Sequence, residues 1–209
     1  MCLRFYRGHA QLSWKLIPGL FRSDSSISPS EEVNVINEMK VKFPSDFENC
    51  RNILECLVKA QHYGIPTRLL DITSNPLVAL YFAVVRPDML KGNAIVKIID
   101  IPMNRIKYYD DKNMLEEMEK VIFEGNKPST VNYCVKARWT NPRITSQFGA
   151  FILFLDSQPL FEYKIHNIEI STSHISHIKS ELASLCITKE ILFPELSSFA
   201  DRLKEGISR

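Results

Sequence analysis

Several features that would assign this 209-residue sequence to a class of protein are scarce or missing. It has seven glycines, no internal repeat and no low-complexity tract, and no apolar run approaches the ~20 residues needed to cross a bilayer. Neither a P-loop nor a GxGxxG motif is present. The first residues lack the apolar stretch and small-residue cleavage site of a secretory signal. These absences favour a cytoplasmic protein with no membrane partner.

An excess of charge and clusters of metal ligands are missing as well. The chain has 26 Lys and Arg against 24 Asp and Glu, so its net charge of +2 does not point to a nucleic-acid partner, although a local basic groove is compatible with it. The five cysteines are scattered and include no CxxC pair, which favours free thiols in a reducing compartment over a zinc site or a disulfide framework. His174 and His177 have no third ligand near them, so no metal is expected.

What the sequence does contain is a mixed set of expected helices and strands. Strands are expected at 3–9, 94–99 and 149–155, a turn with a short strand at 65–74, and an edge hairpin near 160–171. Helices are expected at 28–43, 45–62, 76–85 and in two short segments near the end, the last at about 195–206. Residues 104–142 are expected to form a polar, partly helical insertion. Because strands and helices are segregated, the prediction is a single α+β domain with small mixed or antiparallel sheets flanked by helices.

The first polar cluster is Tyr6-Arg7-Gly8-His9, at the end of the first expected strand. An arginine followed by a glycine can aim its guanidinium at a phosphate while the backbone approaches closely. An edge-strand arginine in a surface ion pair explains the same residues, so this cluster alone does not decide between the two.

The second cluster lies where a short strand leads into the apolar helix that begins at Pro76. Such a junction offers backbone N–H groups and the positive end of a helix dipole to an anionic ligand. The alternative is that Ser74 or Asn75 caps the helix and that Asp71 pairs with Arg68 or Arg7. Capping leaves His62, Thr67 and Arg68 without an explanation. The candidate residues of this cluster are His62, Thr67, Arg68, Asp71, Thr73, Ser74 and Asn75.

The third cluster, with Arg143 and Gln147, precedes the expected strand at 149–155, and Gly149 permits a close approach there. A neutral glutamine offers amide recognition but is a poor general base. Cys134 has no evident His or Asp partner, so the sequence does not support a cysteine nucleophile.

Together these spaced motifs resemble the FRG-domain family, which is named for a Phe/Tyr-Arg-Gly motif. The resemblance covers nearly the whole chain and implies that residues 1–209 form a single FRG-type domain. Such domains occur largely in bacteria and their mobile elements, which suggests a role in phage defence or in a toxin system. The motifs are Tyr6-Arg7-Gly8, AQHYGIPTRLLDITSNPLVALYFA over 60–83, Asn141-Pro142-Arg143, Gln147-Phe148-Gly149-Ala150-Phe151 and Leu192-Phe193-Pro194-Glu195-Leu196.

The order of the motifs is also similar to the ADP-ribosyltransferase fold. There, a first strand carries Arg-Gly, a Ser-Thr-Ser motif precedes an A-x-x-F-A helix, and a third strand begins with Gln/Glu-x-Glu. Tyr6-Arg7-Gly8 would be the first motif, and Asp71 to Ser74 with Ala79 to Ala83 the second. The third departs, because Gly149 stands where the catalytic glutamate would be. Asp71 is nominated as the carboxylate in its place.

The first hypothesis is therefore an ADP-ribosyltransferase-like enzyme that uses a nucleotide cofactor such as NAD and modifies a protein or nucleic-acid acceptor. Asp71 would stabilise developing positive charge, Arg7 and Arg68 would hold phosphates, and Gln147 would orient the acceptor. His62 and Thr73 would position the ribose or nicotinamide end. The remaining cofactor-binding candidates are Gly8, Thr67, Ser74, Asn75 and Arg143.

The second hypothesis is a catalytically inactive nucleotide- or nucleic-acid-binding module. Its basis is the missing glutamate, together with aromatic residues interleaved with Lys and Arg over 104–143. Packing within the insertion would explain these aromatic residues equally well. They are Tyr108, Tyr109, Tyr133 and Trp139.

Overall fold

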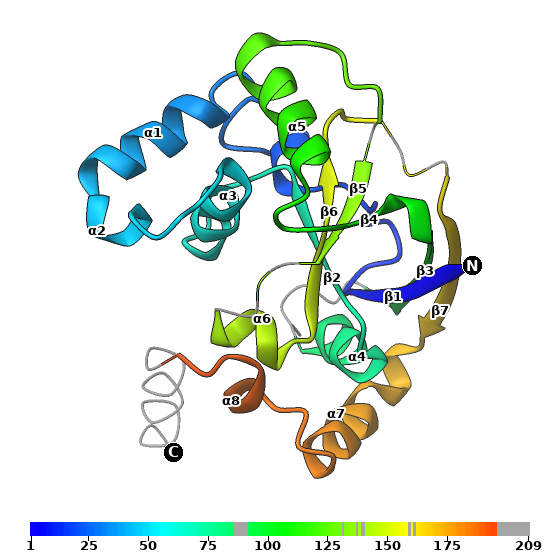
Figure 1. Ribbon diagram of the computed structural model, residues 1–209. Helices are drawn as coiled ribbons and strands as arrows, with labels where there is room; N and C mark the ends of the chain where they lie inside the picture. Colours follow the sequence, from blue (N-terminus) through cyan, green and yellow to red (C-terminus); the bar gives the residue numbers. More distant parts are fainter. Residues whose placement is uncertain are drawn as a thin grey trace.

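A seven-stranded sheet in the order β4-β5-β6-β2-β1-β3-β7 forms the centre of the computed structural model (Figure 1). The structure describes residues 1–85, 92–130, 132–136, 138, 141–158, 160 and 162–195. Only β4 and β5 pair in parallel, and every other neighbouring pair is antiparallel. The strands are β1 (Cys2–His9), β2 (Leu69–Thr73), β3 (Ala94–Pro102), β4 (Ile106–Tyr108), β5 (Asn132–Lys136), β6 (Gly149–Phe154) and β7 (Lys164–Ile170).

The helices lie in two groups on opposite sides of the strands in Figure 1. In Figure 1, α1, α2, α3 and α5 lie above and to the left of the strands, whereas α4, α6, α7 and α8 lie below. The expected α+β class is thus confirmed, with one sheet in place of several small ones. The helices are α1 (Glu32–Lys42), α2 (Pro44–Phe47), α3 (Ile53–His62), α4 (Pro76–Val84), α5 (Lys112–Glu124), α6 (Pro142–Ser146), α7 (Ile175–Ser184) and α8 (Lys189–Leu192).

The sheet consists of two halves joined at a single residue pair. Strand β1 pairs with β3 along its whole length, and β2 pairs with β6 along its whole length. Between β1 and β2, however, only Tyr6 lies opposite Thr73 in the ladder. Thr73 is the last residue of β2, so the rest of β2 is not paired with β1, and side chains of the halves β4-β5-β6-β2 and β1-β3-β7 pack together in one hydrophobic cluster.

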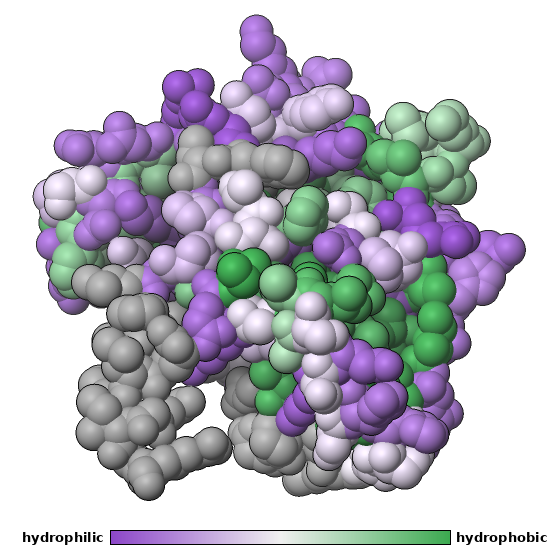
Figure 2. Space-filling view, turned by 90° about the horizontal axis from the view of Figure 1, so that it is seen from below, coloured by the Kyte–Doolittle hydropathy of each residue, from purple (hydrophilic) through white to green (hydrophobic). Residues whose placement is uncertain are grey.

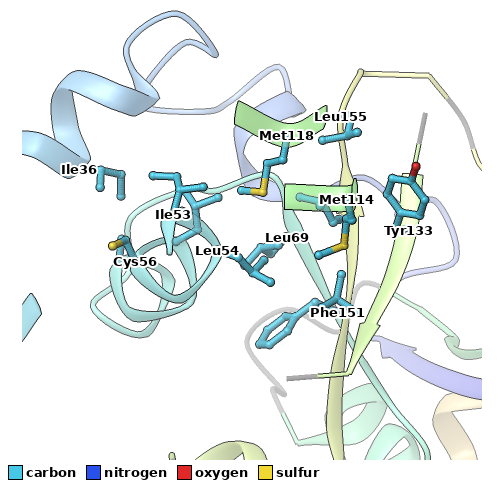
Figure 3. Packing of buried hydrophobic residues seen from close by; sticks show 14 of the residues in the cluster. Ile36, Ile53, Leu54, Cys56, Leu69, Met114, Met118, Tyr133, Phe151 and Leu155 are labelled. Carbon is cyan, nitrogen blue, oxygen red and sulfur yellow. The ribbon is translucent and has the colours of Figure 1, made fainter. Parts of the chain in front are cut away.

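Three hydrophobic clusters join the sheet to its helices and the two half-sheets to each other. Because successive side chains of a strand point to opposite faces of the sheet, neighbouring residues of one strand belong to different clusters. On β2, Leu69 faces α3 and α5 in the first cluster (Figure 3), whereas Leu70 and Ile72 face the second cluster, which contains Phe5 and Ile99 from the other half-sheet. The third cluster lies between α4, α7 and the outer face of β1, β3 and β7.

The expectation for α4 is confirmed in detail. The Asn75 side chain accepts a hydrogen bond of 2.9 Å from Leu77 N–H, and Pro76 occupies the first helical position, where it needs no donor. Val78, Ala79, Ala83 and Val84 are fully buried, as an all-round apolar helix requires, and Tyr81 is 8% exposed.

Three expectations need correction. The helix expected at 45–62 is divided into α2 and α3, because Asn52 caps a new helix by accepting from Glu55 N–H at 3.0 Å. Residues 104–142 contain α5 as expected, but they also supply β4 and β5 to the sheet. The edge hairpin near 160–171 is a single strand, β7. The helix expected at 195–206 falls almost entirely outside the described residues.

The molecular surface below the sheet mixes polar and apolar groups. Figure 2 looks onto this face from below, and apolar atoms gather across its middle and right, among polar ones. The edge strand β7 has two exposed apolar side chains, with Ile165 37% and Ile168 53% exposed. Within the described residues, no helix has the length and apolar character to cross a membrane.

Candidate functional site

A cavity of about 360 Å³ opens where β1 and β2 separate, within the range of ~300–1,000 Å³ found for small-ligand sites. Its walls come from β1, β2, β6, α3, α4 and α6, so residues far apart in the sequence meet there. The structure brings seven of the candidate residues to this cavity: Arg7, Gly8, His62, Asp71, Thr73, Arg143 and Gln147.

Arg7 projects from β1 into the gap between the two half-sheets. Its Nη1 donates a hydrogen bond to the Asp71 backbone carbonyl, which the separated β1 backbone does not reach, and its Nε donates to His9 Nε2 at 2.9 Å. Nη1 also lies 3.8 Å from Asp71 Oδ2. Burial lowers the pKa of Arg7 below its usual 12.5, while Asp71 acts in the opposite direction. Among the described residues, none accepts a hydrogen bond from Nη2, so this part of the fork is available to a ligand.

Asp71 carries an exposed carboxylate on a strand that is otherwise buried. Its side chain is 63% exposed, whereas the other four residues of β2 are buried. Gln61 from α3 donates from Nε2 to Asp71 Oδ1 at 2.8 Å. The Thr67 hydroxyl donates to Gln61 Oε1, which fixes the amide so that its nitrogen faces the carboxylate. Asp71 is therefore held at the cavity wall by a side chain whose own orientation is determined.

Thr73 and Gln147 join β2 to the segment that precedes β6. The Thr73 hydroxyl donates to the Gln147 carbonyl at 2.7 Å and accepts from Asn75 N–H at 3.0 Å. The Gln147 side chain donates from Nε2 to the Leu192 carbonyl in α8 at 2.9 Å. Phe148 follows with a φ of 48°, a left-handed conformation that is uncommon for a bulky residue. The hydroxyl proton of Thr73 and the amide nitrogen of Gln147 thus already have acceptors within the fold.

Arg143 supplies a second guanidinium to the cavity. Its charged group lies 4.6 Å from the centre of the Phe193 ring, and no hydrogen bond from it reaches another described residue. Aromatic groups of Trp14, Phe82 and Phe151 also line the cavity. Residues that carry two cations, one carboxylate and several aromatic rings therefore line the same space.

Four candidate residues lie away from the cavity. Arg68 is 3% exposed, and its Nε and Nη2 both bind Glu32 Oε2 at 2.6 Å, so its guanidinium is held inside the fold away from the cavity. Thr67 is buried and acts on Gln61 as described above. Ser74 N–H donates to the Phe148 carbonyl at 3.1 Å, and the Asn75 side chain caps α4. The structure thus gives these four residues positions that do not face a ligand in the cavity.

The packing of α4 against β1 requires a glycine at position 8. A β-carbon at this position would lie 1.8 Å from the Ala79 carbonyl oxygen and 2.6 Å from Ala83 N. Helix α4 therefore rests directly on β1 at Gly8, and only glycine permits this approach. Gly149 differs, because a β-carbon there would be 3.4 Å from its nearest neighbours in Ile144, which is ordinary contact.

Two site residues were not singled out from the sequence. The sequence pattern gives His9 no role of its own, although its position two residues after Arg7 on the same strand places both side chains on one face. Gln61 has no local signal, because its partnership with Asp71 depends on the packing of α3 against β2.

The cysteines, the histidines and the aromatic residues of 104–143 are the other candidate functional residues of the sequence. All five cysteines are free, and burial raises the pKa of Cys134 to about 12, which keeps it protonated. Among the described residues, no group of three or more His, Cys, Asp or Glu is placed to hold a metal ion. Of the aromatic residues in 104–143, Tyr133 is 9% exposed and donates to Glu117, Tyr108 is 63% exposed, and Trp139 lies outside the described residues.

The chain is similar to a known protein family over part of its length. No curated protein and no solved structure matches it. The family model of the FRG domain does match, over residues 4–91. This range holds most of β1 and all of α3, β2 and α4, and with them Arg7, Asp71 and their supporting side chains, whereas Arg143 and Gln147 lie beyond it. The part of the chain that builds most of the cavity is thus similar to the FRG domain.

Proposed function

We propose that the cavity binds a nucleotide, with NAD as the ligand, and that the protein is an ADP-ribosyltransferase-like enzyme. The observation that carries this proposal is the pairing of two opposite charges across the opening between β1 and β2. Arg7 presents Nη2, from which no described residue accepts a hydrogen bond, and Asp71 presents a carboxylate held by Gln61. An arginine fork suits a phosphate, and a held carboxylate suits a positive charge that develops during reaction.

The cavity walls fit the other parts of a nucleotide. Trp14, Phe82 and Phe151 offer ring surfaces for a base, while Arg7 and Arg143 give the site more positive than negative charge. The burial of Arg7 strengthens its interaction with an anion, because less water screens the charge.

The reaction that fits these groups breaks a glycosidic bond. When bound, NAD supplies the bond between ribose C1′ and nicotinamide; its electron pair leaves with nicotinamide, and a nucleophilic atom of the acceptor bonds C1′ and releases its proton to solvent. Asp71 would stabilise the positive charge that develops on the ribose in this step. Arg7 and Arg143 would hold the phosphates, and the Gln147 side-chain carbonyl would orient the acceptor.

A second candidate function is nucleotide binding without transfer. It is favoured by Gly149, which places no carboxylate at the start of β6. A nucleic-acid version of this candidate would use the exposed Tyr108, whose ring centre lies 5.9 Å from Lys136 Nζ. It has less support, because three other cations of the region 104–143 are already paired with acids: Arg105 with Glu162, Lys107 with Asp111, and Arg138 with Glu55.

Calorimetric titration with NAD, combined with a nicotinamide-release assay, tests the proposal. We expect saturable binding that Arg7→Ala weakens by about 10- to 100-fold, the equivalent of one or two charge-assisted hydrogen bonds. Asp71→Asn should keep binding but lower nicotinamide release by about 100-fold or more. Arg4→Ala is the matched control, because Arg4 lies on the same strand in an exposed ion pair with Asp100.

The outcomes separate the two candidate functions. Binding without nicotinamide release by the native protein would favour the inactive module. No binding of NAD to the native protein would refute the proposal, and equal loss in Arg4→Ala and Arg7→Ala would show that the effect is not specific to the cavity.

A further inference from the structure

We infer that His9 is a positioning residue, which holds the Arg7 guanidinium in the orientation that meets the ligand. This inference rests on the proposed function of the cavity. It concerns a side chain that does not line the cavity but touches Arg7, which does.

The two hydrogen bonds of His9 determine where its proton lies. Arg7 Nε is a donor, so His9 Nε2, at 2.9 Å, must accept with its lone pair. On the other side of the ring, Nδ1 lies 3.1 Å from the Trp14 carbonyl oxygen, which can only accept. A neutral imidazole with its proton on Nδ1 satisfies both contacts at once. The imidazolium form cannot, because Nε2 would then be a donor facing a donor.

The surroundings of His9 favour this neutral ring. The residue is 3% exposed, and the Trp14 ring packs edge-on against it at 5.9 Å between ring centres. Burial, with the charges of Arg7, Lys97 and Arg22, lowers the pKa of His9 to about 3, against a smaller opposing effect of the Trp14 carbonyl. Lys97 lies directly opposite Arg7 on β3. His9 therefore keeps its acceptor for Arg7 throughout the neutral range.

The consequence for Arg7 is a guanidinium fixed at two points. Nε is held by His9 and Nη1 by the Asp71 carbonyl, so the plane of the fork is determined before a ligand enters. A flexible arginine loses side-chain freedom when it binds a phosphate, and a fixed one has already lost it on folding. His9 thereby contributes to affinity without contacting the ligand.

Two substitutions separate this role from simple packing. His9→Phe keeps a ring of similar size but removes the acceptor, whereas His9→Gln can accept from Arg7 and donate to the Trp14 carbonyl. We expect His9→Phe to weaken NAD binding by about tenfold and His9→Gln by less than about threefold, because one charged hydrogen bond distinguishes them.

A coupling measurement provides the decisive comparison. In an Arg7→Lys background the Nε–H donor is absent, so His9→Phe should change NAD affinity by less than about twofold. A packing role would produce the same loss in both backgrounds, and this result would overturn the inference.

A readout without ligand distinguishes failure of this inference from failure of the proposed function. Nitrogen-15 NMR of the native protein should show the His9 ring protonated at Nδ1 and not at Nε2, with no titration between pH 5 and 8. If NAD does not bind while this signature is present, the proposed function fails alone. If the His9 ring titrates in this range or carries its proton on Nε2, the inference fails whatever binds.

Discussion

Arg68 and Glu32 form an ion pair that is almost completely buried. The surroundings of Arg68 thus give it a structural role, unlike those of Arg7 and Arg143, which line the cavity. The Arg68 side chain is 4% exposed and that of Glu32 is 2% exposed. Arg68 Nε donates to Glu32 Oε2 at 2.6 Å, and Arg68 N–H donates to Oε1 at 3.3 Å. The same Arg-Leu-Leu-Asp sequence that suggests a phosphate ligand thus supplies a structural cation that links α1 to the start of β2.

This pair leads to a prediction about stability. Arg68→Ala should lower the free energy of unfolding by about 3–5 kcal/mol, because it leaves the Glu32 carboxylate buried without a partner. Arg143→Ala, the matched control at the cavity, should cost about 1 kcal/mol, the loss of its contact with Phe193. Urea unfolding measures both. Similar losses in the two variants would contradict the division between structural Arg68 and cavity-facing Arg143.

At the scale of elements, the contact between α4 and β1 depends on one missing side chain. Gly8→Ala would place a methyl group within 2.6 Å of Ala83 N and even closer to the Ala79 carbonyl, both in the rigid backbone of α4. We expect this variant to lose about 3 kcal/mol or more, or to fail to fold, since the helix must move. Gly149→Ala should stay within about 1 kcal/mol of the native protein, because its neighbours leave room. The urea denaturation midpoints of the two variants measure this difference. If Gly8→Ala is tolerated, glycine is not needed there for packing, and a close approach of the Gly8 backbone to a ligand would be the remaining reason for it.

Elements governed by local rules are the ones that the sequence predicts well. The Asn75-Pro76 start of α4 needs only a cap and an apolar run, and β6 needs only a short β-branched and aromatic stretch. The parallel pairing of β4 with β5 could not be predicted, because it joins Ile106 to Cys134 across α5. Pairing of this kind depends on packing between distant segments, which a local pattern does not contain.

The candidate site follows the same division. Sequence motifs place Arg7, Asp71 and Gln147 near the ends of expected strands, but the cavity exists because β1 and β2 share only the Tyr6–Thr73 pair. The supports of Arg7 and Asp71 come from His9 on one half-sheet and Gln61 on α3. Contacts across such a junction arise from the whole molecule and could not be predicted from spacing.

At the scale of the whole molecule, His9 makes stability depend on pH. Its pKa is about 3 in the folded state and close to 6.5 when unfolded, so between these values the unfolded chain binds a proton that the folded protein excludes. Stability is therefore full above about pH 6.5 and falls as the pH is lowered. From pH 7 to pH 5 the loss should be about 2 kcal/mol, at about 1.4 kcal/mol for each pH unit below 6.5.

Carboxylates affect stability in a different range. The folded pKa values of Asp100, Asp111 and Glu117 are lowered, Asp100 mainly through its hydrogen bond with Arg4, and Asp111 and Glu117 through hydrogen bonds that outweigh burial. Their contribution to stability is present above the pKa values of the unfolded chain, near 4, and is lost only in stronger acid.

Urea unfolding of the native protein and of His9→Gln at pH 7 and pH 5 therefore measures the contribution of His9 alone. The variant should lose about 2 kcal/mol less than the native protein over this interval. Equal losses would mean that His9 accepts a proton in the folded state, and its bond to Arg7 would then be absent at pH 5.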